Sequence, residues 1–196
     1  MKRIKHIKKE LIKMYGNEAT AGIIESAGKY YNECLALCEN VAKGEFMHLE
    51  NTILPTTSFY KALMEIDSEN ALKNINFIIT SLCEKGNRIL NRMLKFPGMK
   101  SVFMKQLPKI AIMQFGRGCG FDYENIKVSK KSFLMDMTVC PYLKYTKLFN
   151  VPELIAVFCE SDFITYGNLD GISFQRTETL GTGGSKCDFR FFRTDK

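Results

Sequence analysis

The spacing of the apolar residues changes once along the chain, and this change constrains the fold more than any other feature. Before Gly116, apolar residues recur at intervals of three and four, which is typical of amphipathic helices. After the glycine-rich segment 116–120, apolar and polar residues alternate, which is typical of strands. The sequence therefore predicts an α+β fold, with a helical N-terminal half packed on a small C-terminal antiparallel sheet with helices. We expect a mostly helical region at 1–107 and an α+β region at 108–196, or one single domain.

The N-terminal half contains two long helical patterns. Residues 18–41 place Cys34 and Cys38 on one apolar stripe, where free cysteine packs as a small hydrophobe. A longer helix is predicted from Asp67 or Ser68, as its N-cap, to about residue 96, because Pro97 and Gly98 follow it.

Shorter segments connect and follow these helices. Residues 44–57 contain Gly44, Pro55 and a Thr-Thr-Ser cluster, which predict a loop that leads into a short helix at 59–66. Another helix is expected at 99–106, before Pro108. The pattern at 109–115 does not decide between a helix and a strand.

The C-terminal half contains the residues that could take part in catalysis or ligand binding. In a strand at 132–140, alternation puts Asp136 and Cys140 on the face opposite Met135 and Met137. A helix is expected at 141–148, and a second begins at 151–152. On this second helix, four residues share one face at intervals of three and four: Ile155, Cys159, Asp162 and Tyr166.

In the tail, the sequence predicts two antiparallel strands, at 172–180 and 186–193, joined by a Gly-Thr-Gly-Gly-Ser loop. On the last strand Cys187 shares a face with two phenylalanines, whereas Asp188 and Arg190 point the other way. The sequence does not fix the loop register, so the face that carries Arg176 stays open.

Composition excludes several classes of protein. No apolar segment with a cleavage site follows the basic N-terminal residues, and no stretch is long enough to span a bilayer, so we expect a cytoplasmic protein without a membrane partner. Seven cysteines without a CxxC pair indicate reduced thiols. Two histidines leave little scope for a histidine-rich zinc site. The basic stretch 85–131 is interpreted as a solvated face, since no nucleic-acid-binding motif accompanies it.

Several C-terminal segments resemble the L-2-amino-thiazoline-4-carboxylic acid hydrolase family. The resemblance covers about residues 130–192. Its matching pieces are Cys140-Pro141, Phe158-Cys159-Glu160-Ser161-Asp162, Arg176-Thr177-Glu178-Thr179-Leu180, Gly183-Gly184 and Cys187-Asp188-Phe189-Arg190. The resemblance implies hydrolytic opening of a small cyclic C=N substrate, such as 2-amino-thiazoline-4-carboxylate, to an N-carbamoyl cysteine. We predict no cofactor.

The implied chemistry suits the residues of these segments. Cys140 or Cys159 is a possible nucleophile, with Cys187 as a third candidate, and Asp162 or Glu160 is a possible general base. The carboxylate of a small-molecule substrate requires a cation, for which Arg176 and Arg190 are candidates, with Asp188 beside them.

Two other functions remain open from the sequence. Cys140, Cys159 and Cys187, with Cys119 as a possible fourth ligand, could bind a metal ion or an iron–sulfur cluster. Alternatively, the same residues could line the pocket of a non-catalytic ligand-binding or sensory module.

Overall fold

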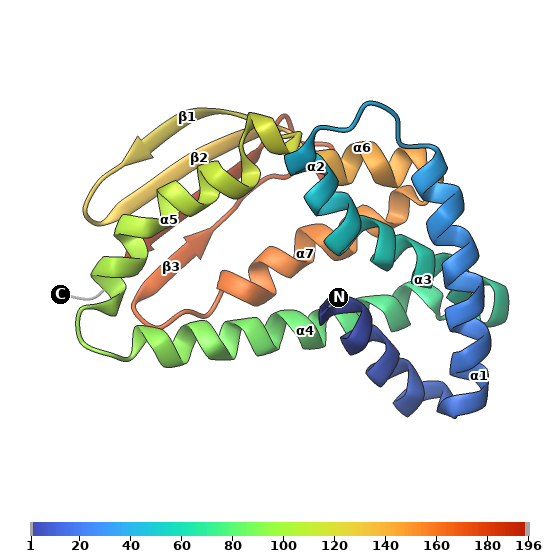
Figure 1. Cartoon of the computed structure of the whole chain (residues 1–196). Coiled ribbons are helices and arrows are strands. Elements are labelled where there is room, and N and C mark those ends of the chain that lie inside the picture. The colour runs from blue at the N-terminus through green and yellow to red at the C-terminus, as the bar shows by residue number, and fades with distance from the viewer. Residues whose placement is uncertain (1, 195–196) are drawn as a thin grey trace.

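The computed structural model describes residues 2–194, in which helices precede most of the sheet (Figure 1). The helical half contains α1 (Lys2–Ala36), α2 (Lys43–His48), the π-helix η1 (Leu49–Ile53), α3 (Leu54–Ile66), α4 (Ala71–Leu94) and α5 (Met99–Phe115). The second half contains η2 (Arg117–Cys119), β1 (Asp122–Val128), β2 (Ser132–Val139), α6 (Pro141–Leu148), η3 (Pro152–Leu154), α7 (Ile155–Tyr166), β3 (Ile172–Gln175), η4 (Leu180–Thr182) and β4 (Cys187–Arg193). The fold is α+β, which confirms the predicted class.

Helix α1 is longer than predicted and consists of two segments. Gly16 has φ 76° and ψ 174°, a backbone region that is open almost only to glycine, and it divides the helix. The two segments meet at a sharp angle in Figure 1. Ile7 and Leu11 of the first segment are fully buried, so this segment packs into the helical core.

The predicted loop at 44–57 is wrong, because α2, η1 and the start of α3 form continuous helical structure there. Pro55 lies in the first turn of α3, where a missing backbone N–H is tolerated. The Thr-Thr-Ser cluster that indicated a loop is instead buried in the helix, and Ser58 donates to the carbonyl oxygen of Pro55 at 3.1 Å.

Two further helix boundaries differ from the prediction. Helix α4 has Asn70 as its N-cap, three residues after Asp67. Helix α5 continues through Pro108 to Phe115, because Met104, Pro108 and Ala111 form one buried face. The same helix therefore runs across the expected boundary between 107 and 108.

The sheet has four antiparallel strands in the order β1-β2-β4-β3. Phe133, Met135 and Met137 of β2 lie opposite Phe191, Phe189 and Cys187 of β4. These side chains form one apolar face, which packs with residues of α5 in a second core cluster. Figure 1 shows α5 running alongside β2, and α7 between β3 and α3.

A β-bulge changes the predicted orientation of Cys140. Asp122 pairs with Val139 and the next residue, Tyr123, pairs with Met137, so Thr138 is an extra residue on β2. The extra residue shifts the alternation by one position. Val139 is consequently exposed, and Cys140 lines the same cavity as Met135 and Met137. The prediction that Cys140 faces away from the methionines is wrong.

No helix within residues 2–194 combines the length and the apolar character needed to cross a membrane.

Candidate functional site

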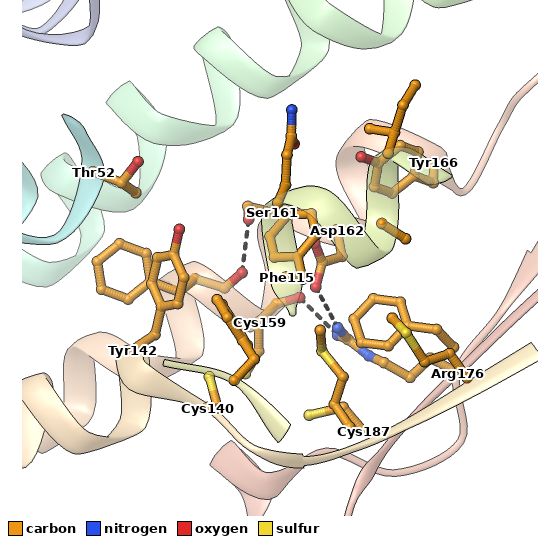
Figure 2. Close-up of a pocket in the computed structure, with 18 of the residues that line it drawn as sticks. Thr52, Phe115, Cys140, Tyr142, Cys159, Ser161, Asp162, Tyr166, Arg176 and Cys187 are labelled. Atoms are coloured by element: carbon orange, nitrogen blue, oxygen red, sulfur yellow. Dashed lines mark hydrogen bonds and ion pairs between the residues drawn. The ribbon is translucent and has the colours of Figure 1, made fainter. Parts of the chain in front are cut away.

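A cavity of about 230 Å³ lies where the apolar face of the sheet meets α5, α6 and α7. Most of its lining is apolar and aromatic, including Phe115, Phe121, Phe133, Phe158, Phe189 and Phe191. Its polar lining comprises Arg3, Thr52, Gln114, Cys140, Tyr142, Cys159, Ser161, Asp162, Tyr166, Arg176 and Cys187. Figure 2 shows many of these side chains gathered around one space; those that it labels come from η1, α5, α6, α7, β4 and the segment after β3. Such a lining is typical of a small-molecule site.

Asp162 and Arg176 form an ion pair at the wall of the cavity (Figure 2). Nη1 of Arg176 donates to Oδ2 of Asp162 at 2.6 Å, and Nη2 donates to the backbone oxygen of Cys159 at 2.7 Å. The guanidinium also stacks over Phe163, 4.7 Å from the ring centre. Arg176 thus ties the segment after β3 to α7, and its side chain is only 2% exposed.

Asp162 has the protonation behaviour of an acid–base group. Burial raises the pKa of Asp162 to about 6, although Arg176 acts in the opposite direction. The side chain is 31% exposed and lines the cavity. A carboxyl group with a pKa near neutrality, facing a cavity, is suited to general acid–base catalysis.

Cys159 lies one turn before Asp162 on α7, as predicted. Burial raises the pKa of its thiol, while Thr179, Arg176 and the backbone of Gly181 act against this effect. The backbone of η4 approaches the sulfur closely, because a Cβ atom added at Gly181 would lie 2.7 Å from Sγ of Cys159. Glycine is therefore required where η4 packs on α7.

Cys140 and Cys187 line the cavity together with Cys159, so the structure brings the three predicted thiols to one site. Burial raises the pKa of Cys140 to about 12 and also raises the pKa of Cys187. The backbone N–H of Leu180 donates to Sγ of Cys187 at 3.3 Å. All three groups are consequently neutral thiols at physiological pH.

The sequence does not predict a hydrogen-bonded group in which Tyr142 contacts both His48 and Thr52. Nε2 of His48 lies 2.7 Å from the carbonyl oxygen of Gln114, which can only accept, so Nε2 carries the proton. Nδ1 then accepts from the hydroxyl of Tyr142 at 3.0 Å. Burial lowers the pKa of His48, which keeps the ring neutral. The incorrect loop at 44–57 hid this group, since His48 and Thr52 are one turn apart on a helix.

Arg3, also missed, reaches the cavity from the first turn of α1. Its Nη1 atom is buried and has no hydrogen-bond partner. A sequence signal for Arg3 exists, because it precedes the buried Ile7 and Leu11 at intervals of four on one helical stripe.

Three other predicted site residues lie outside the cavity lining. Glu160 is exposed on α7 and accepts from Asn76 at 3.1 Å. Asp188 accepts from the backbone N–H of Thr177 at 2.8 Å. Arg190 forms an ion pair with the buried Asp136 on the other face of the sheet. The contact of Glu160 joins α7 to α4, whereas those of Asp188 and Arg190 stabilise the sheet and the segment after β3.

No three histidine, cysteine or carboxylate side chains within residues 2–194 are arranged as a group that could hold a metal ion. The thiols of Cys140, Cys159 and Cys187 share the cavity without forming such a group, and Cys119 is buried elsewhere in the sheet cluster.

Comparison with known proteins identifies the family. No curated protein is similar enough to this chain to match it. The family model of L-2-amino-thiazoline-4-carboxylic acid hydrolase matches residues 47–191, a segment that includes nearly the whole cavity lining. The chain belongs to the L-2-amino-thiazoline-4-carboxylic acid hydrolase family.

Proposed function

We propose that the protein is a hydrolase that opens a small cyclic C=N substrate, such as 2-amino-thiazoline-4-carboxylate, to an N-carbamoyl cysteine. The observation that carries this proposal is Asp162, a carboxyl group with its pKa raised to about 6 at the wall of a cavity, in a chain of this family. Family membership supports hydrolysis, and the cavity supports a small substrate.

The size of the cavity supports a substrate of one ring with a few substituents. An engineered protein cavity of about 150 Å³ accommodates benzene. The cavity of about 230 Å³ described above therefore has room for a five-membered ring with an amino and a carboxylate group. Aromatic walls such as Phe158 and Phe189 would hold such a ring by its faces.

The reaction requires one water molecule and two proton transfers. The oxygen of water adds to the carbon of the C=N bond, the bond from this carbon to the ring sulfur breaks, and the carbon becomes the carbonyl of the carbamoyl group. One proton of the water ends on the ring nitrogen and the other on the departing sulfur. Asp162, as a carboxylate, takes a proton from the attacking water, and as a carboxylic acid it returns that proton to a leaving atom.

Arg176 acts as a positioning residue in this scheme. Its two Nη atoms bind the Asp162 carboxylate and the backbone of α7, so they fix the direction of the carboxylate. The positive charge also opposes the effect of burial, which keeps a useful fraction of Asp162 ionised at neutral pH.

The protonated state of the thiols favours water over a cysteine thiolate as the nucleophile. Burial raises the pKa of Cys140, Cys159 and Cys187, and Arg176 does not offset this effect at Cys159. In this scheme the thiols are neutral, polarisable wall groups around the ring.

Incubation of the protein with 2-amino-thiazoline-4-carboxylate, followed by mass spectrometry and a free-thiol assay, tests the proposal. We expect N-carbamoyl cysteine and one new thiol per turnover, and we expect Asp162→Asn to abolish both. Glu160→Gln is the matched control, since Glu160 lies on the same helix outside the cavity. Absence of product from the wild type at micromolar concentrations would contradict this substrate. Tight binding of the acid without product would favour the alternative of a non-catalytic binding module.

A further inference from the structure

Arg3 is a half-buried cation without an acidic partner, and this feature is independent of the Asp162–Arg176 pair. Nη1 of Arg3 is inaccessible to solvent and makes no hydrogen bond. Among residues 2–194 no carboxylate forms an ion pair with it. Its guanidinium stays protonated in proteins, so the charge remains when the side chain is buried. A buried charge is costly unless another group compensates for it.

We propose that Arg3 binds the anionic group of the cavity's ligand, a carboxylate in the substrate class of the proposed function, and thereby selects acids over neutral rings. This inference rests on the proposed function for the identity of the ring. The inference that an anion binds here depends only on the cavity and on the charged residues that line it.

The charges of the cavity lining leave one positive charge without a counterpart. Arg3, Arg176 and Asp162 are the charged residues that line the cavity, and they sum to a single positive charge while Asp162 is ionised. Asp162 is paired with Arg176. A ligand with one negative charge would therefore neutralise the cavity, and Arg3 is the cation that lacks a partner there.

The hydrogen-bond donors also favour Arg3 over Arg176 as the anchor. Both Nη atoms of Arg176 are occupied by Asp162 and by the carbonyl of Cys159, which leaves only its Nε without a partner. Arg3, which also lines the cavity, has a terminal nitrogen, Nη1, without a hydrogen-bond partner. A charge-assisted hydrogen bond from a guanidinium to a carboxylate is among the strongest polar contacts in proteins.

The first segment of α1 holds Arg3 in place. Ile7 and Leu11, one and two turns later, are fully buried in the helical core. His6 contacts the hydroxyl of Ser81 on α4, with 2.7 Å between Nε2 and Oγ. Arg3 is thus a fixed wall group, although it lies outside residues 47–191, which the family model matches.

Isothermal titration calorimetry with two aromatic probes tests the inference without turnover. The probes are 2-aminothiazole-4-carboxylate and 2-aminothiazole, which differ by the carboxylate and have a ring that resists hydration. We expect the wild type to bind the acid more tightly than the neutral ring. Arg3→Met should weaken binding of the acid by about 10- to 100-fold, the range of a hydrogen bond to a charged group, and leave the neutral ring unaffected. Lys5→Met, on the same helix with an exposed side chain, should leave both affinities unchanged.

The outcomes separate this inference from the proposed function. Equal affinity of the wild type for both probes, no binding of the acid, or an Arg3→Met variant that keeps its preference for the acid would overturn the role of Arg3. If the wild type forms no product from the thiazoline acid but binds the acid probe in an Arg3-dependent way, the proposed hydrolase function would be contradicted and the role of Arg3 would stand. If Arg3→Met fails to fold, Arg3→Lys serves instead, because it keeps the charge but lacks the planar guanidinium that can bind a carboxylate through two N–H groups. We expect its affinity for the acid to fall several-fold. Unchanged affinity in that variant would also overturn the inference.

Discussion

Arg176 donates from Nη1 to Oδ2 of Asp162 across 2.6 Å, so a cation that follows strand β3 holds a carboxylate of α7 at the cavity wall. The same guanidinium binds the backbone oxygen of Cys159, one turn earlier on the helix. This double contact connects the edge strand of the sheet to the helix that carries the proposed base. The pair therefore links the stability of the fold to the ionisation of Asp162.

Replacement of Arg176 should affect both properties. Arg176→Gln removes a charge that lowers the pKa of Asp162, so the acid limb of the pH–rate profile should move to higher pH. It should also lower the free energy of unfolding by about 1–3 kcal/mol, the range for leaving a buried hydrogen-bond partner unsatisfied. Arg190→Gln is the matched control, because Arg190 pairs with Asp136 outside the cavity. An unshifted profile in active Arg176→Gln enzyme would refute the positioning role.

The close approach of Gly181 to Cys159 predicts a steric effect. In Gly181→Ala the new Cβ atom would meet Sγ of Cys159 at 2.7 Å and a side-chain carbon of Ile155 at 2.8 Å. We expect stability to fall by about 1–3 kcal/mol, as for other overpacked cores, and turnover to fall with it. Adding Cys159→Ala should restore part of the stability, as chemical denaturation would measure. Gly118→Ala, where no atom lies within 4 Å, should have little effect.

The raised pKa values of the three cavity thiols predict slow alkylation. With its pKa raised to about 12 by burial, the Cys140 thiol is almost wholly protonated at pH 7.5, and iodoacetamide reacts with the thiolate. Mass spectrometry should find Cys140, Cys159 and Cys187 unmodified in the folded protein under conditions that label them fully in denaturant. Each Cys→Ser variant should keep more than about a tenth of the wild-type turnover. Rapid labelling of one cavity thiol with complete inactivation would instead indicate a cysteine nucleophile.

The backbone of Gly16 predicts a specific loss of stability. Its combination of φ 76° and ψ 174° is strained for any residue with a Cβ atom, although no neighbouring atom would clash. Gly16→Ala should therefore lower the free energy of unfolding by about 1–3 kcal/mol for conformational reasons alone. Gly28→Ala, in the same helix without a positive φ, should be neutral or stabilising. Equal stability of the two variants, measured by urea denaturation, would show that α1 has no such break.

The parts of the site that the sequence predicted lie on a regular element. On α7 the intervals among Ile155, Cys159, Asp162 and Tyr166 match one helical face, and all four residues line the cavity. The same holds for the alternation on β4, which puts Cys187 in the cavity and Arg190 outside it. Regular periodicity fixes direction, and a prediction from it succeeds where the element has no irregularity.

The parts that could not be predicted depend on irregular backbone or on distant packing. The bulge at Thr138 reverses the orientation of Cys140. Strand β1 was not predicted at all, because a positive φ at Asn125 and a register shift between Glu124 and Lys127 interrupt its alternation. Arg3 reaches the cavity only because α1 packs on α4, a contact between residues far apart in sequence.

The pH dependence of kcat/KM for thiazoline hydrolysis tests the central claim, that Asp162 is the general base, most directly. Because the base must be deprotonated, the account predicts a rate that rises with pH through the pKa of about 6 and levels off above it. At pH 5 the wild type should retain about a tenth of its plateau rate, Glu160→Gln should follow the same curve, and Asp162→Asn should lack this limb and nearly all activity. A wild-type rate that stays constant from pH 5 to pH 8, or an Asp162→Asn variant with the wild-type rate, would contradict the account.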